Sequence, residues 1–140
     1  MANFKERIEA EFENIQKVLS RLPESNTLSN LSDLELAGVA ALIHSFYNGV
    51  ENILKQAVRE KGKDVPQGQT WHRDLVELTV NEGIISHKTS KAIAQYLAFR
   101  HFFSHAYAFD LHPERIVPLV KGAKDVFENL RMDIESLQNK

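Results

Sequence analysis

The chain has 140 residues, a formal net charge of −2 and no cysteine, and 43% of its residues are hydrophobic and 26% charged. This length and composition predict one globular domain covering residues 1–140. The absence of cysteine excludes disulfides, thiolate metal sites and a cysteine nucleophile, and the charge excludes a globally basic nucleic-acid coat.

The N-terminus and the apolar stretches predict a cytoplasmic protein with no membrane contact. Lys5, Glu6 and Arg7 place charges where a signal peptide would need an apolar run. The longest apolar stretches, such as residues 37–43, are too short to span a bilayer.

The first part of the chain predicts an amphipathic helix. Hydrophobic residues recur at three- or four-residue steps from Phe4 to Leu22, and Pro23 ends the pattern. A polar stretch over residues 24–30 separates this helix from the next.

The second predicted helix is long and has signals at both ends. Ser32 and Glu35 match a capping box, in which each side chain satisfies a free backbone amide of the other residue. The helix is expected to run to about Lys61, because Gly62 can adopt the left-handed conformation that ends helices.

Three polar residues share one stripe of this second helix. His44, Tyr47 and Glu51 follow one another at three- and four-residue steps and could reach a cleft. A place in the core is the simpler expectation for Tyr47, and Glu51 is not counted among the catalytic residues.

A loop rich in glycine and proline leads to a short helix. Residues 61–70 form the loop, and the helix carries Trp71, an expected core or dimer-interface anchor, and ends at Gly83. The Lys and Arg residues that could form local basic patches are mostly expected to lie on solvated helix faces. They are Lys55, Arg59, Lys61, Lys63, Lys88, Lys91 and Arg100.

Two further helices complete the expected fold. One begins at Ser86 or His87 and is interrupted over residues 110–113, and the last helix continues to Leu137. Pro113 and Pro118 both suit the first position of a helix, where their missing amides would be unpaired in any case. The fold class is therefore all-α, an antiparallel bundle of four long helices plus one short helix.

The residues best suited to catalysis lie close together in the sequence. Positions 100–107 read Arg-His-Phe-Phe-Ser-His-Ala-Tyr. Each helical residue turns by about 100°, so the arginine, both histidines and the tyrosine fall on an arc from about −20° to about 140°. Phe102 and Phe103 fall on the opposite side, at about 200° and 300°. This spacing predicts a helix that presents its reactive groups to a cleft and packs its aromatic groups inside.

Each of these residues also has a purely structural interpretation. Arg100 could pair with a carboxylate on the surface, His105 could be a hydrogen-bonded core histidine, and Tyr107 could be a buried tyrosine with a satisfied hydroxyl. His101 either supports His105, binds phosphate or simply belongs to the helix surface.

A metal site is disfavoured, although His101 and His105 have the four-residue spacing that lets two imidazoles share a metal. Further ligands are needed, and Asp110 and His112 lie beyond the expected helix break. Ser104 faces the same arc but has no activating triad, so serine nucleophilic catalysis is not expected.

The pattern Arg100-x4-His105-x-Tyr107 resembles the signature of the HEPN superfamily, and within it the HepT toxins of HEPN–MNT toxin–antitoxin pairs. In those proteins the motif lies near the end of the penultimate long helix of an all-α bundle, which is its expected place here. The position after the arginine is typically polar in HEPN ribonucleases, and here it is His101.

The resemblance implies a metal-independent endoribonuclease toxin that needs no cofactor and assembles its site across a homodimer. Arg100 would bind the crowded phosphate, and His105 would act as base or acid, since an unperturbed histidine has a pKa near ~6.5. His101 would support catalysis or bind phosphate. The RNA could be tRNA or mRNA, because phosphate contacts carry no sequence information.

The resemblance also implies control by a cognate MNT nucleotidyltransferase antitoxin, which would attach AMP to Tyr107. Each added phosphodiester brings roughly one negative charge to the vicinity of Arg100. AMPylation would therefore neutralise the toxin through both charge and bulk.

Two other functions remain open at this point. The chain could be a non-catalytic HEPN-like module that binds nucleotide or presents a substrate to a partner nucleotidyltransferase, or a structural helical dimer. Arg100 and His105 together favour the ribonuclease, because binding alone would not require a group that titrates near neutral pH.

Overall fold

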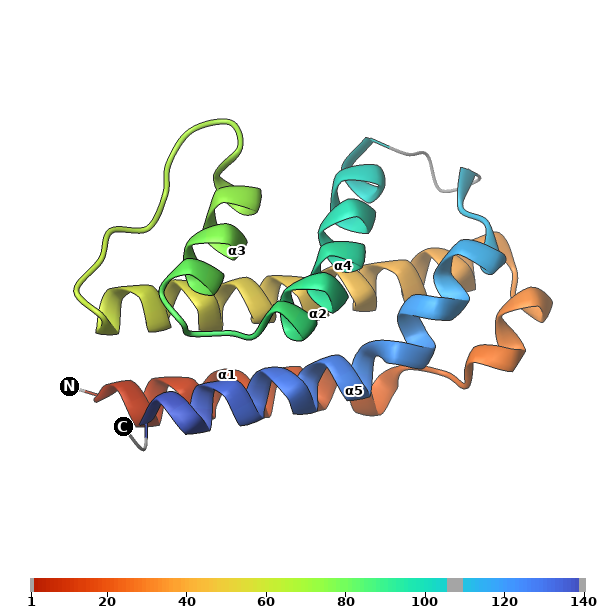
Figure 1. Cartoon of the computed structure of the whole chain (residues 1–140). Helices are drawn as coiled ribbons and strands as arrows, with labels where there is room; N and C mark the ends of the chain where they lie inside the picture. Colours follow the sequence, from red (N-terminus) through yellow and green to blue (C-terminus); the bar gives the residue numbers. More distant parts are fainter. Residues whose placement is uncertain (1, 106–109, 139–140) are drawn as a thin grey trace.

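The computed structural model describes residues 2–105 and 110–138, and this part of the chain contains helices and no strand. The helices, in chain order, are α1 (Phe4–Arg21), the 3-10 helix η1 (Ser25–Asn30), α2 (Asp33–Glu60), α3 (Trp71–Asn81), α4 (His87–His105) and α5 (Pro113–Gln138). The predicted all-α class is confirmed for these residues. In Figure 1, α1, α2 and the second half of α5 run lengthwise, while α3 and α4 stand across α2.

Helix α2 is the centre of the hydrophobic core and contacts α1, α3, α4 and α5. Its predicted end signals are confirmed. The side chain of Ser32 accepts a hydrogen bond from the amide of Glu35, the carboxylate of Glu35 accepts one from the amide of Ser32, and Gly62 has a φ of 76°. These two ends fix the length of the helix that carries the core.

The polar stretch after α1 forms η1 and adds one residue to the core. Leu28 is fully buried, although its neighbours Thr27 and Ser29 are exposed. Helix η1 packs against α5, so it closes the end of the core opposite the two chain termini (Figure 1).

The two prolines expected at helix starts behave differently. Pro113 is the first residue of α5, as predicted, but Pro118 lies inside α5, so the prediction for Pro118 is wrong. A proline inside a helix removes one backbone hydrogen bond and bends the helix. Figure 1 shows α5 changing direction along its length, which lets its first part reach α4 and its second part follow α1.

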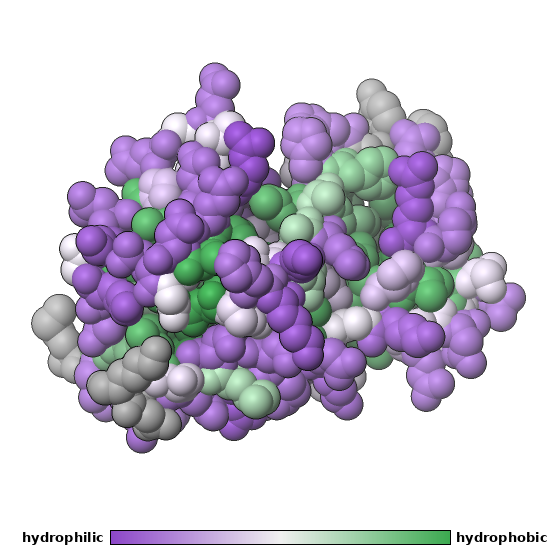
Figure 2. Space-filling model, viewed as in Figure 1, coloured by the Kyte–Doolittle hydropathy of each residue, from purple (hydrophilic) through white to green (hydrophobic). Residues whose placement is uncertain are grey.

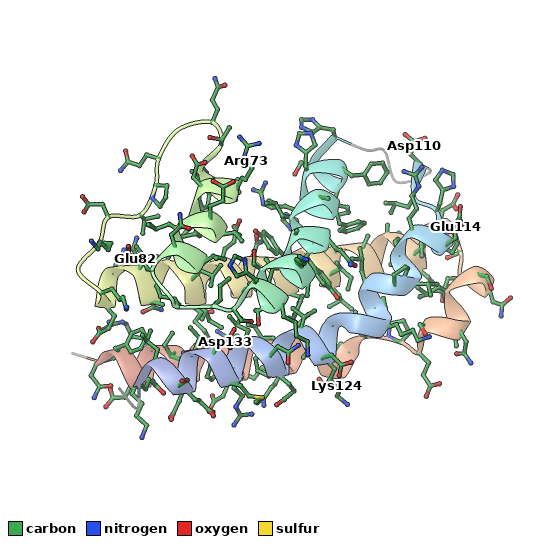
Figure 3. All side chains as sticks on the ribbon, in the orientation of Figure 1. Arg73, Glu82, Asp110, Glu114, Lys124 and Asp133 are labelled. Atoms are coloured by element: carbon green, nitrogen blue, oxygen red, sulfur yellow. The ribbon has the colours of Figure 1, made fainter. Side chains whose placement is uncertain are left out.

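The start of α4 is anchored to α5 through one carboxylate. Asp133 Oδ2 accepts hydrogen bonds from the amide of Ser86 at 3.1 Å and from the hydroxyl of Thr89 at 2.7 Å, and Figure 3 shows Asp133 on α5. Ser86 Oγ in turn accepts from the amide of Thr89 at 3.1 Å. These bonds satisfy free amides at the start of α4, and the carboxylate also suits the positive end of the helix dipole.

None of the helices in the described part of the chain is long and apolar enough to cross a membrane.

Helices α1 and α2 approach each other closely at Gly49, which gives a first prediction. A Cβ atom there would lie 2.6 Å from Cγ1 of the buried Ile15, so we expect Gly49→Ala to destabilise the fold by about 1–3 kcal/mol through overpacking. Gly38→Ala is the matched control, because Gly38 is exposed on the same helix and has free space around it. The control should gain about 0.5–1 kcal/mol from alanine's helix propensity. Urea denaturation measures both changes, and stabilisation of both variants would contradict the close approach.

The anchor at Asp133 gives a second prediction. Asp133→Ala leaves a buried hydroxyl and a helix-terminal amide without their acceptor, and we expect a loss of about 1–3 kcal/mol. Glu128→Ala removes the same charge from an exposed position on the same helix and should stay within about 0.5 kcal/mol of the parent. Equal denaturation midpoints for the two variants would show that Asp133 does not hold α4.

Candidate active site

The motif residues lie on the last turns of α4, whose earlier turns are held in the core. Tyr96 is buried, and its hydroxyl donates a hydrogen bond of 2.6 Å to the carbonyl of Leu119 on α5. Its ring packs edge-to-face against Phe46 of α2 at 5.2 Å. The buried Phe99 stacks on Phe103 at 5.8 Å, so packing continues up to the motif. The end of α4 is therefore presented on a fixed support.

The predicted separation of polar and aromatic faces is present at the end of α4. His101, Ser104 and His105 are exposed, whereas Phe102 and Phe103 are partly buried against the core. The rings of His101 and His105 lie 5.0 Å apart, edge to face. The two exposed imidazoles thus form one pair near the helix end.

Arg100 is half-buried and lies at the inner edge of this polar face. Its Nε atom is buried and has no hydrogen-bond partner among the described residues. Its positive charge acts on His44 of α2. The pKa of His44 is lowered mainly by burial and secondly by the charge of Arg100, whereas the charge of Glu51 raises it. The arginine therefore lies between the core and the surface, where an anion could pair with it.

Behind Arg100 lies a buried polar group that belongs mainly to α2. Glu51 is only 3% exposed, and its Oε2 atom is 2.5 Å from Nδ1 of His72 on α3. Tyr47 is buried, as expected from the sequence, and burial and the negative charge of Glu51 raise the pKa of its phenol far above the ordinary value. The phenol therefore stays neutral. We call His44, Tyr47, Glu51, His72 and Arg100 the inner cluster.

Two clefts adjoin the end of α4. The cleft between α3 and α4, visible as a notch in Figure 2, has a volume of about 480 Å³. Its lining residues are Gln69, Thr70, His72, Arg73, Leu97, Ala98, Arg100 and His101. A second cleft of about 550 Å³ lies between the end of α4 and the start of α5. Its lining residues, with Asp110 labelled in Figure 3, are His101, Phe102, His105, Asp110, His112 and Arg115.

The division into two clefts refines the predicted site. Arg100 opens to the α3–α4 cleft, His105 opens to the α4–α5 cleft, and His101 lines both. The sequence places all three residues on one arc of α4, and the structure shows that this arc is wide enough to border two openings. Tyr107 lies outside the described residues.

Arg100 is the one residue of the inner cluster that was predicted as a site residue; His44, Tyr47, Glu51 and His72 were not. Glu51 does lie on the polar stripe with His44 and Tyr47, and this stripe is the signal that could have found it. Nothing local to His72 indicates its contact, because its partner is 21 residues away on another helix. In the described residues, no group of three or more side chains is arranged to hold a metal ion.

The chain was compared with known proteins in three ways. A family model described as HepT-like protein matches residues 38–140, which include most of α2 and the whole of α3, α4 and α5. The search of curated proteins gave no match, and neither did the search of solved structures. The matched region contains the inner cluster, both clefts and the motif, and covers well over half of the chain, so the chain belongs to the HepT-like family.

Proposed function

We propose that this protein is the metal-independent endoribonuclease toxin of a toxin–antitoxin pair. The observation that carries the proposal is the end of α4, where the imidazoles of His101 and His105 lie 5.0 Å apart next to the half-buried Arg100 and two open clefts. Membership of the HepT-like family supports it, because HepT-like HEPN proteins are generally nuclease toxins. Arg100 and His105 are the catalytic residues of this proposal, and His101 supports them.

These side chains match what RNA cleavage without a metal requires. The 2′-hydroxyl loses its proton to a base, its oxygen attacks the adjacent phosphorus, and the bond from phosphorus to the 5′-oxygen breaks as that oxygen gains a proton from an acid. Arg100 stabilises the added negative charge on the phosphate through its fixed guanidinium donors. His105 supplies one of the two proton transfers, since an imidazole exchanges protons near neutral pH.

A homodimer completes the proposal. A mainly apolar groove, distinct from the α4–α5 cleft, also lies between α4 and α5. Figure 2 shows apolar side chains gathered over α4. Ala98, Phe102 and Pro118 line this groove beside the motif. A second copy placed about a two-fold axis beside α4 would cover these side chains and bring two sets of Arg100 and His105 together.

Control by a partner is the last part of the proposal. The MNT-type nucleotidyltransferase antitoxin transfers AMP to Tyr107, which follows His105 by two residues in the sequence. The added phosphodiester brings negative charge and bulk close to the catalytic histidine along the chain, and so opposes the binding of RNA.

The catalytic assignment gives a third prediction. Producing the wild-type chain without its antitoxin should stop growth and fragment RNA, and His105→Ala and Arg100→Ala should abolish both effects. Loss of a proton-transfer group typically costs 10²–10⁴-fold in rate, so we expect a fall of about that size for purified His105→Ala. Cleavage by the purified wild type should persist in EDTA.

His87→Ala is the control for this experiment, because it removes an exposed histidine from the other end of the same helix. It should remain toxic. Soluble, folded wild-type protein that leaves growth and RNA intact would contradict the ribonuclease and favour a module that presents a substrate to the nucleotidyltransferase.

The proposed modification gives a fourth prediction. Tyr107→Phe removes the hydroxyl that accepts AMP, so we expect this variant to stay toxic when the antitoxin is co-produced, with no gain of AMP mass in intact-protein mass spectrometry. Tyr96→Phe serves as the control, because the Tyr96 hydroxyl is buried against Leu119. AMP transfer to Tyr107→Phe would show that another residue is the acceptor.

A further inference from the structure

The pair formed by Glu51 and His72 lies outside the motif but beside Arg100. Glu51 comes from α2 and His72 from α3, and their Oε2 and Nδ1 atoms are 2.5 Å apart. The carboxylate side chain is 4% exposed and the imidazole 18% exposed. The pair therefore connects a buried charge to a histidine that still reaches the surface.

This contact determines which nitrogen of His72 is free. A carboxylate without its proton only accepts hydrogen bonds, so with Glu51 in that form Nδ1 of His72 would carry the hydrogen that Oε2 accepts. In a neutral imidazole the other nitrogen, Nε2, then has a free lone pair. A buried carboxylate that holds a histidine in this tautomer is the arrangement that prepares an imidazole to take a proton.

The cleft that His72 lines suits a phosphate. Arg73, Arg100 and His101 line the same cleft, and no carboxylate is among its described lining residues. Figure 3 shows Arg73 projecting from α3 on the side that faces α4. An RNA backbone bound here would meet Arg100 and His72 together.

We propose that His72 is a catalytic residue of the RNA cleavage, acting as the general base, and that Glu51 positions it. This inference rests on the proposed ribonuclease function and assigns the proton transfer that His105 does not perform. Nε2 of His72 takes the proton of the 2′-hydroxyl, and the 2′-oxygen forms a bond to phosphorus. The bond from phosphorus to the 5′-oxygen breaks, and His105 donates a proton to that oxygen. The products are a 2′,3′-cyclic phosphate and a 5′-hydroxyl.

A purely structural role for His72 predicts a different result from substitution. The buried carboxylate of Glu51 needs a donor, and loss of that donor would destabilise the fold. Asparagine at position 72 keeps an N–H donor near the place of Nδ1 but has no group that accepts a proton at neutral pH. His72→Asn therefore separates the two roles.

The fifth prediction is that folded His72→Asn cleaves RNA about 100-fold more slowly than the wild type, the lower range for loss of a general base. Glu51→Gln should lower kcat while leaving KM nearly unchanged, because it disturbs the orientation of His72 without removing a substrate contact. His87→Asn, the same change at an exposed site on α4, should cleave normally. Circular dichroism and thermal denaturation check the folding of each variant.

A substrate with sulfur in place of the 5′-oxygen distinguishes base from acid. Its leaving group needs no proton, so His105→Ala should recover most of its activity on this substrate, and His72→Asn should remain slow. Recovery of His72→Asn instead would overturn the assignment of His72 as the base.

Two further results would overturn the inference. Cleavage by His72→Asn within about threefold of the wild type, when the wild type is active and His105→Ala is not, would leave the ribonuclease standing and remove His72 from the mechanism. A wild type without cleavage would overturn both proposals. If His72→Asn does not fold, ¹⁵N NMR of the wild-type imidazoles decides: a hydrogen on Nε2 of neutral His72 contradicts the proposed tautomer.

Discussion

Helix α2 packs its apolar side against four other helices, and the burial of this side constrains where each of them can lie. It contacts α1, α3, α4 and α5, and a 28-residue helix is about 42 Å long, enough to extend through a small domain. Burial of apolar surface is the main force that favours folding, so the surrounding helices pack where they cover α2. The clefts lie between helices that this packing fixes, which gives the candidate site a rigid support.

Glu51 lies on this buried side of α2, where an unpaired carboxylate would cost the fold free energy. Removing a carboxylate from water costs several kcal/mol, and only close hydrogen-bonding or charged partners offset that cost. His72 provides the hydrogen bond, and the positive charge of Arg100 acts on the same inner cluster. The contact of Glu51 with His72 thus joins α2 to α3 at the wall of the α3–α4 cleft.

The sequence predicts the elements well because their signals are local. The spacing of apolar residues marks the helices, Ser32 and Glu35 mark the start of α2, and Gly62 marks its end. The prediction for Pro118 fails because the residue type alone does not show whether a proline begins a helix or lies inside one. Packing around α5 decides this. The pairing of Glu51 with His72 depends on how α3 packs on α2, which no local pattern records.

The sequence placed the motif residues on one arc of α4, but how the neighbouring helices divide this arc between two clefts depends on packing. This division matters for the proposed dimer. Residues five apart on a helix point about 140° from each other, and this angle explains why Arg100 and His105 of one chain open to different clefts. A single phosphate can contact both groups more readily when a second copy turns its own His105 toward the first chain's α3–α4 cleft. In that arrangement Arg100 and the proposed base His72 would come from one chain, and the proposed proton donor His105 from the other. Dimerisation would then bring the acid and the base together, so that an isolated chain would hold only part of the proposed machinery.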